Sequence, residues 1–161
     1  MTDIKDTLPK PFSNMLENYN LSKKNMPSGQ KSGHWDVFPE DYEEAIKKSE
    51  MIFLEGYLWD EGEPKSAFDK AMSLSKKKAM SLSDQFCVDR HKESFLNIVK
   101  NDLDITFANE QEVKSLINAK NFDEVITFGK ELEKLLVITR GSKGSVAIKG
   151  NEIFECESQK N

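Results

Sequence analysis

The sequence is poor in the residues that build disulfide frameworks and metal sites. It has two cysteines and two histidines among 161 residues. Cys87 and Cys156 lie far apart and form no C-x-x-C pair, so neither a disulfide scaffold nor a zinc ribbon is expected. His34 and His91 are better explained as exposed residues of a loop or a helix start than as metal ligands. A reducing cytoplasm is therefore the simplest compartment.

Long apolar runs and an excess of positive charge are also lacking. The apolar stretches fall far short of the roughly 20 residues of a membrane helix, and the N-terminal residues, with Asp3 and Asp6, do not resemble a secretory signal. The net charge of −5 gives no general attraction to nucleic acid or to an anionic membrane. Neither is expected as a partner, and 32% charged residues suit a protein with a well-solvated surface.

The chain divides into two parts by its composition. Residues 1–37 contain prolines and glycines with little periodicity, so we expect a poorly defined segment with one short helix around 12–19 and a linker at 26–33. In residues 38–161, apolar runs alternate with helix-like segments. This order predicts right-handed βαβ units and a mainly parallel sheet.

The boundaries of the predicted elements follow from apolar periodicity and capping residues. The strand-like runs are Met51–Gly56, Met80–Ser83, Ile105–Ala108 and Leu135–Thr139. Helices are predicted over 40–48, 64–77, 90–100, 109–117 and 122–132. The pair Gly150-Asn151 between 145–148 and 153–156 predicts a C-terminal β-hairpin.

One hexamer, Lys-Ala-Met-Ser-Leu-Ser, occurs twice and is assigned to different structures. The copy at 70–75 is predicted to be helical and the copy at 78–83 to be a strand. The neighbouring lysines 76–78 are expected to be the solvated end of the preceding helix rather than a nucleic-acid patch.

Polar or small residues follow each of the strand-like runs. If the runs are parallel strands, these groups share the edge of the sheet where open α/β sheets bind ligands. They are Trp59-Asp60, Asp84, Asn109–Glu112 and Arg140–Gly144.

Asn109 and Glu112 stand at the start of a predicted helix, directly after a strand. One interpretation is that Asn109 only caps the helix. The other is that both side chains face the crevice, where Glu112 could hold Mg²⁺ through water and the metal could meet phosphate oxygens.

The segment Thr139–Gly144 follows the next strand. Its glycines would let the backbone approach a phosphate or a flat base, and successive N–H groups could form an anion nest. The alternative is an ordinary turn before a strand. Walker A spacing is absent.

The segment 83–91 is dense in reactive side chains, but we favour structural roles over nucleophilic chemistry. Asp84 is expected to end a strand, Asp89 to cap the helix 90–100, and Cys87 to pack. Tyr57 and Trp59 could line a pocket or cover the core.

Together, the sequence segments that contain these sites resemble the ribokinase-like (PfkB-type) sugar and nucleoside kinases, above all their adenosine-kinase-like branch. They occur in the family's order and spacing over about residues 38–156. The matching segments are Phe53–Asp60, Leu82–His91, Asp104–Glu112 and Val137–Ser145.

This resemblance implies a three-layer α/β/α fold and transfer of the ATP γ-phosphoryl group to a sugar or nucleoside hydroxyl. Asn109 and Glu112 would match the family's Asn-x-x-Glu motif, which organises Mg²⁺ and phosphates, with Glu112 as the metal-site residue. Thr139, Gly141 and Gly144 would match its nucleotide-contacting turn. ATP and Mg²⁺ are the implied cofactors.

Two family features are absent from these residues. There is no Gly-x-Gly-Asp, the motif that supplies the family's anion hole and general base, and the early Gly-Gly and Asn substrate segment is missing. We therefore expect a truncated family member that keeps part of the ATP and Mg²⁺ side and has almost no activity alone. The alternatives are a non-catalytic module that associates with itself or with a full-length kinase through an exposed sheet edge, and a fragment without a stable role.

Overall fold

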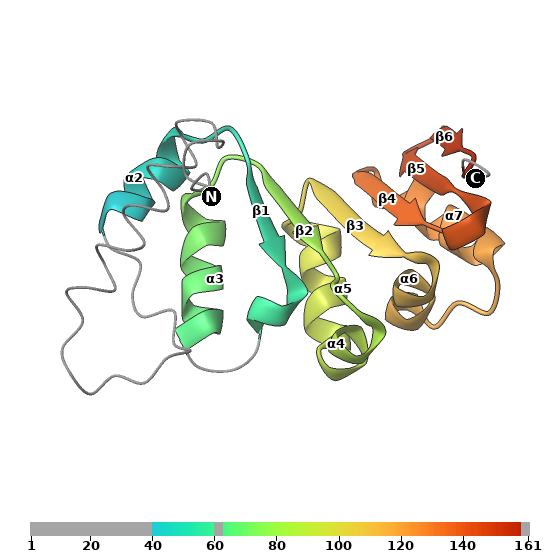
Figure 1. Ribbon diagram of the computed structural model, residues 1–161, viewed down its shortest axis with the longest axis horizontal. Coiled ribbons are helices and arrows are strands. Elements are labelled where there is room, and N and C mark those ends of the chain that lie inside the picture. The colour runs from blue at the N-terminus through green and yellow to red at the C-terminus, as the bar shows by residue number, and fades with distance from the viewer. Residues whose placement is uncertain (1–39, 60–62, 159–161) are drawn as a thin grey trace, which may run out of the picture. The chain divides into compact units, whose positions relative to one another are not determined.

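The computed structural model describes residues 40–59 and 63–158 (Figure 1). The short helix expected around 12–19, the linker 26–33, the boundary at residue 37 and Asp60 all lie outside the described residues. None of the helices in the described ranges is long and apolar enough to cross a membrane.

The described residues form one six-stranded sheet whose strands lie in chain order (Figure 1). The strands are β1 (Ile52–Glu55), β2 (Lys78–Ser81), β3 (Ile105–Asn109), β4 (Leu135–Thr139), β5 (Ser145–Lys149) and β6 (Glu152–Cys156). β1 to β4 pair in parallel, whereas β4–β5 and β5–β6 pair antiparallel. The predicted α/β class, the mainly parallel sheet and the C-terminal hairpin are confirmed.

The connections between the parallel strands are helical. The helices are α2 (Glu40–Lys48), α3 (Glu63–Leu74), α4 (Gln85–Arg90), α5 (Lys92–Asn101), α6 (Glu110–Ile117) and α7 (Phe122–Leu132), with short 3₁₀ turns η2 (Gly56–Trp59) and η3 (Gly141–Lys143). Neighbouring parallel strands are joined by right-handed crossovers in nearly all proteins, and with this strand order such crossovers place the helices on the same face of the sheet. The described residues thus supply the sheet and one helical layer.

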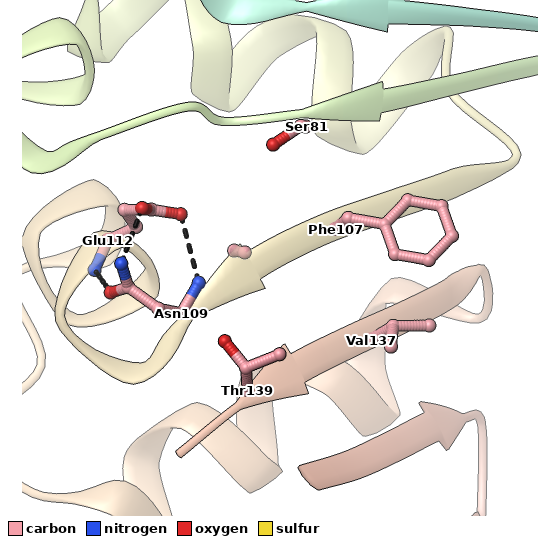
Figure 2. A pocket seen from close by; sticks show the side chains of 7 residues that line it. Ser81, Phe107, Asn109, Glu112, Val137 and Thr139 are labelled. Carbon is pink, nitrogen blue, oxygen red and sulfur yellow. Dashed lines mark hydrogen bonds between the residues drawn. The ribbon is translucent and has the colours of Figure 1, made fainter. Parts of the chain in front are cut away.

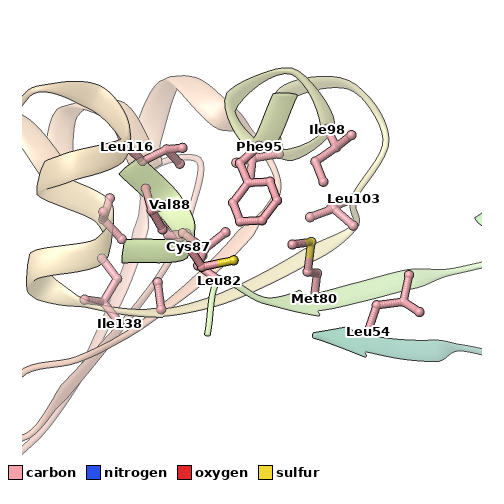
Figure 3. Packing of buried hydrophobic residues seen from close by; sticks show 14 of the residues in the cluster. Leu54, Met80, Leu82, Cys87, Val88, Phe95, Ile98, Leu103, Leu116 and Ile138 are labelled. Atoms are coloured by element: carbon pink, nitrogen blue, oxygen red, sulfur yellow. The ribbon is translucent and has the colours of Figure 1, made fainter. Parts of the chain in front are cut away.

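The core lies between this helical layer and the sheet. On β3 and β4, alternate residues point into it, so Ala108 and Ile138 are buried while their strand neighbours are less so. Figure 3 shows Phe95 and Val88 directed from the helices toward Leu82, and all three are fully buried. Burying side chains of this size contributes roughly 1.5–3 kcal/mol each, which fixes the layers against one another.

The helix predicted over 90–100 is present as α5 (Lys92–Asn101), but its predicted cap, Asp89, is wrong. The structure has two helices there, α4 and α5, and the cap of α4 is Asp84, whose Oδ1 accepts the N–H of Cys87 at 2.6 Å. Asp89 lies within α4 and accepts a hydrogen bond from Ser115 of α6. Helix α4 starts directly after the strand because Asp84 lies at that point and is a good N-cap.

The lysines 76–78 are not the end of a helix. α3 ends at Leu74, and Lys78 opens β2 opposite Ile52, with its N–H donating to Asp104 Oδ2 at 2.8 Å. Lys78 is therefore the first residue of a strand that pairs with β1, and not the last turn of a helix.

Candidate functional site

Asn109 and Glu112 form a capping box at the carboxyl end of β3. The Asn109 Oδ1 atom accepts the N–H of Glu112 at 2.9 Å, and the Asn109 N–H donates to Glu112 Oε2 at 2.9 Å. The Asn109 amide also donates to Glu112 Oε1. The prediction that Asn109 caps this helix is confirmed, and the box holds both side chains rigidly at the sheet edge.

The Glu112 carboxyl group is buried, with 4% of the residue exposed. Burial raises its pKa above the ordinary value, and the negative charge of Asp84 adds to this, while the hydrogen bonds from Asn109 oppose it. A carboxylate in this position gains from a nearby cation, which would offset the cost of burying the charge.

The turn after β4 lies beside this capping box because β3 and β4 are paired in parallel, with Asn109 opposite Thr139. Within the turn, the N–H of Lys143 donates to the Arg140 carbonyl at 3.1 Å and the N–H of Gly144 to the Gly141 carbonyl at 3.0 Å. These two amides are used inside the turn, so they do not contribute to the predicted anion nest.

The two glycines of the turn have different surroundings. Both have positive φ, 57° at Gly141 and 83° at Gly144. No described atom lies within 4 Å of a Cβ built on Gly141, whereas a Cβ on Gly144 would lie 1.9 Å from the carbonyl oxygen of Cys156. Gly144 is thus required by packing against the end of β6, while the space above Gly141 is open.

A shallow pocket of about 200 Å³ opens where β3 and β4 end (Figure 2). It brings together three of the predicted site residues, Asn109, Glu112 and Thr139, but Gly141 and Gly144 do not line it. Its other lining residues are Ser81, Phe107, Ala108 and Val137.

Phe107 and Val137 were not singled out from the sequence, although a signal existed. Each stands two residues before a predicted site residue on the same strand, Asn109 or Thr139, and residues at this spacing share a face of a sheet. The strand register alone could therefore have placed them beside the site.

The aromatic residues after β1 divide between the two roles considered for them. Trp59 packs edge-on against Phe68 and Phe95, with ring centroids 4.9 and 5.7 Å apart, so it covers the core. Tyr57 is exposed, and its hydroxyl donates to Asp84 Oδ2 at 2.8 Å. The pKa of the Asp84 carboxyl is lowered, first by the hydrogen bond from the Cys87 N–H and then by that of Tyr57. Cys87 is buried, as expected.

Comparison with known proteins decides the family. The model of the pfkB family of carbohydrate kinases matches residues 20–161, most of the chain. The protein belongs to this family. No curated protein matched the sequence.

Solved kinases share the fold of this pfkB-family chain. Adenosine kinase from Sinorhizobium meliloti is 31% identical with a TM-score of 0.69, the match covering 74% of this chain and 38% of that one. A probable sugar kinase from Rhizobium etli CFN 42 is 30% identical with a TM-score of 0.69, covering 73% and 37%. A putative ribokinase II from E. coli, solved with ATP and Mg²⁺, is 19% identical with a TM-score of 0.63, covering 74% and 41%, which shows the fold alone. The chain spans about two fifths of the length of these structures.

The residues at the pocket of this pfkB-family chain fit a magnesium ion that keeps most of its water. Among the described residues no group of three or more His, Cys, Asp or Glu side chains is arranged to hold a metal directly. Each oxygen of Glu112 accepts one hydrogen bond from Asn109 and retains a second lone pair. Mg²⁺ is commonly bound in this way, through one or two carboxylates, several waters and the phosphates of a substrate.

Proposed function

We propose that these residues form part of the ATP and Mg²⁺ side of a kinase that phosphorylates a sugar or nucleoside hydroxyl. The observation that carries this proposal is the convergence of Asn109, Glu112 and Thr139 on one pocket at the carboxyl edge of β3 and β4. This is the edge where α/β sheets bind their ligands. Membership of the pfkB family supports the reaction class.

Each site residue has a distinct proposed role. Glu112, oriented by Asn109, holds the water shell of Mg²⁺, and the ion supplies charge neutralisation for the phosphates. Thr139 and the open backbone at Gly141 contact the nucleotide, while Gly144 closes the turn that presents them. The open space above Gly141 supports a close approach of a ligand at this point.

As the acceptor of the phosphoryl group, an adenosine-like nucleoside is favoured over a sugar. The support is the 31% identity with the adenosine kinase from Sinorhizobium meliloti. The 30% identity with a probable sugar kinase from Rhizobium etli CFN 42 keeps a sugar acceptor as the competing choice.

The first test of this proposal is binding of a fluorescent ATP analogue, measured with and without Mg²⁺. We expect Glu112→Gln to lower the Mg²⁺-dependent affinity at least about tenfold, since groups that orient a bound metal have effects of this size. The one oxygen of glutamine can still accept the Asn109 N–H and so keep the capping box, although the bond from the Asn109 side-chain amide is lost, so the fold should survive. The matched control is Gln111→Ala, an exposed neighbour outside the pocket. Equal affinity for Mg²⁺–nucleotide in wild type and Glu112→Gln would contradict the assigned role of Glu112.

We further propose that the 161 residues by themselves transfer phosphoryl groups at almost no rate, because they contain no Gly-x-Gly-Asp. Without positioned donors for the developing charge and a base for the acceptor, the transition state lacks its main stabilisation. A coupled assay with ATP and adenosine, ribose or fructose measures this. Turnover above that of an Asn109→Ala, Lys143→Ala double variant would disprove inactivity.

The alternative function is a non-catalytic module that associates with itself or with a full-length kinase. The observation in its favour is β6, whose residues are all exposed and which pairs with β5 alone among the described strands. An edge strand with open backbone groups can pair with another chain.

The cytoplasmic location remains part of the proposal. Cys87 is buried, Cys156 is exposed, and both are free thiols, which is compatible with a reducing compartment.

A further inference from the structure

Arg140 joins the turn after β4 to two helices. Its Nε atom donates to Glu110 Oε2 at 2.9 Å, and its guanidinium carbon lies 3.5 Å from the centroid of the Phe122 ring. Glu110 is the first residue of α6 and Phe122 the first residue of α7. One side chain thus links its own turn to two other segments of the chain.

This contact is shielded from water. The side chains of Arg140 and Glu110 are only 17% and 15% exposed. A charge-assisted hydrogen bond in such surroundings is weakened less by solvent and salt than a surface ion pair. The stacking on Phe122 adds a cation–π contact on the other side of the guanidinium. Arg140 is therefore held in one place rather than sampling solvent.

The backbone of Arg140 closes the turn that its side chain anchors. Its N–H donates to the Gly144 carbonyl at 2.8 Å, and its carbonyl accepts the N–H of Lys143 at 3.1 Å. The partner Glu110 lies between Asn109 and Glu112 in sequence, in the first turn of α6. The bond between the two side chains consequently ties the glycine turn to the capping box.

Glu110 is itself fixed in place. Its Oε1 atom accepts from Lys114 Nζ at 2.6 Å, one turn along α6, while Oε2 accepts from Arg140. The two cations, Lys114 first, lower the pKa of the Glu110 carboxyl. Arg140 thus shares the Glu110 carboxylate with Lys114, and its bond to Oε2 ties the turn to the first residue of α6.

We infer that Arg140 is a positioning residue of the nucleotide site, which sets the distance between the turn 141–144 and the Asn109–Glu112 capping box. This inference rests on the proposed function, in which the two parts bind the nucleotide and its Mg²⁺. A misplaced loop weakens such a site because binding requires both parts at once.

The test uses the full chain and two measurements. Hydrogen exchange of the amides of residues 139–146, without nucleotide, reports how firmly the turn is held. Affinity for the fluorescent ATP analogue, with and without Mg²⁺, reports the site. We expect Arg140→Gln to speed exchange in the turn several-fold and to reduce the Mg²⁺-dependent affinity about tenfold, with Arg140→Lys restoring part of both.

The chain offers a matched control and a partner variant. Lys114→Gln removes the other hydrogen bond to Glu110 and should leave exchange in the turn unchanged. Glu110→Gln should reproduce the effect of Arg140→Gln from the opposite side, which keeps the inference testable if one variant fails to fold. The effects of the two substitutions should be less than additive in the double variant, because both remove the Arg140–Glu110 bond, while the Phe122 and Lys114 contacts are each lost in one variant only.

Each result has a definite meaning. Unchanged exchange in Arg140→Gln and Glu110→Gln, or additive effects in the double variant, would overturn the inference. A wild-type chain that binds no nucleotide would overturn the proposed function instead, and the exchange rates alone would then decide whether Arg140 holds the turn.

Discussion

At the scale of single residues, the two glycines of the turn after β4 separate a structural requirement from a proposed binding role. Gly144 has no room for a side chain because the backbone at Cys156 passes directly beside it. Gly141 has a left-handed backbone but open space around it. The same residue type is therefore needed for packing at one position and is available for ligand approach at the other.

This difference predicts distinct effects of alanine at the two positions. Gly141→Ala should cost about 1–2 kcal/mol, the cost of placing a Cβ in the left-handed region. Gly144→Ala should cost clearly more, since its Cβ would also collide with the Cys156 carbonyl. Urea denaturation measures both. Equal destabilisation by the two substitutions would contradict this account.

The control for binding is Gly150, which also has positive φ and open surroundings but lies in the β5–β6 turn. Gly150→Ala should match Gly141→Ala in stability. Only Gly141→Ala should weaken binding of the ATP analogue, because only that turn is proposed to meet the nucleotide.

At the scale of elements, the start of α4 shows how one residue sets a helix boundary. Asp84 accepts the N–H of Cys87 and the hydroxyl of Tyr57, so the helix begins at Gln85. The sequence pattern predicts only the helix over 90–100, capped by Asp89, and places Asp84 at the end of a strand. Helix α4 is missed because it is short and breaks again at His91.

The Asp84 cap predicts a pH dependence of stability. Its pKa is lowered in the folded chain, so the unfolded chain binds more protons in the pH range from its ordinary value of 3.8 down to the folded value. Its contribution is thus present above 3.8 and is lost as the pH falls through the folded pKa. Asp84→Asn should be less stable than wild type near neutral pH, and the difference should vanish in acid, as measured by urea denaturation across pH.

Tyr57→Phe serves as the intermediate case. It removes the hydroxyl donor to Asp84 and leaves the bond from the Cys87 N–H, so it should show a smaller difference with the same direction. A stability difference between wild type and Asp84→Asn that is constant across pH would speak against the assigned pKa shift.

At the scale of the whole molecule, the described residues form a sheet with one helical layer, and the chain spans about two fifths of the length of the kinases it matches. Both edges of this sheet, β1 and β6, pair on one side only among the described strands. On β6, Phe154 is 64% exposed. Exposed edges with apolar side chains are a known route to association between chains.

If the proposed alternative function holds, self-association through β6 should depend on concentration. Light scattering over a range of concentrations should give a mass above 18.4 kDa that falls on dilution. Phe154→Lys should shift the chain toward the monomer, since charges on edge strands oppose pairing. The control Lys149→Ala changes a residue of β5, inside the hairpin. A mass equal to one chain at every concentration would rule out self-association as the alternative function.

Much of the described fold could be predicted from the sequence where the apolar pattern was long or the helix-capping residue was clear. The helix over 122–132 and the strand over 135–139 were predicted with the bounds that the structure has. Asn109 was predicted as the cap of α6, and the Gly150-Asn151 pair as the hairpin turn. In each case the signal is local, because a period, a cap or a turn depends on neighbours in the sequence.

The sequence by itself determined which segments are apolar, how they alternate, and therefore that a mainly parallel α/β sheet forms. It could not determine which backbone partners compete for each segment. The two copies of Lys-Ala-Met-Ser-Leu-Ser were assigned correctly from their context, and they lie mainly in α3 and in β2, but the six letters are the same, and only the second copy pairs with strands on both sides. The pocket and the bond between Arg140 and Glu110 likewise arise only when β3 and β4 pair in register, since they join residues that are distant along the chain.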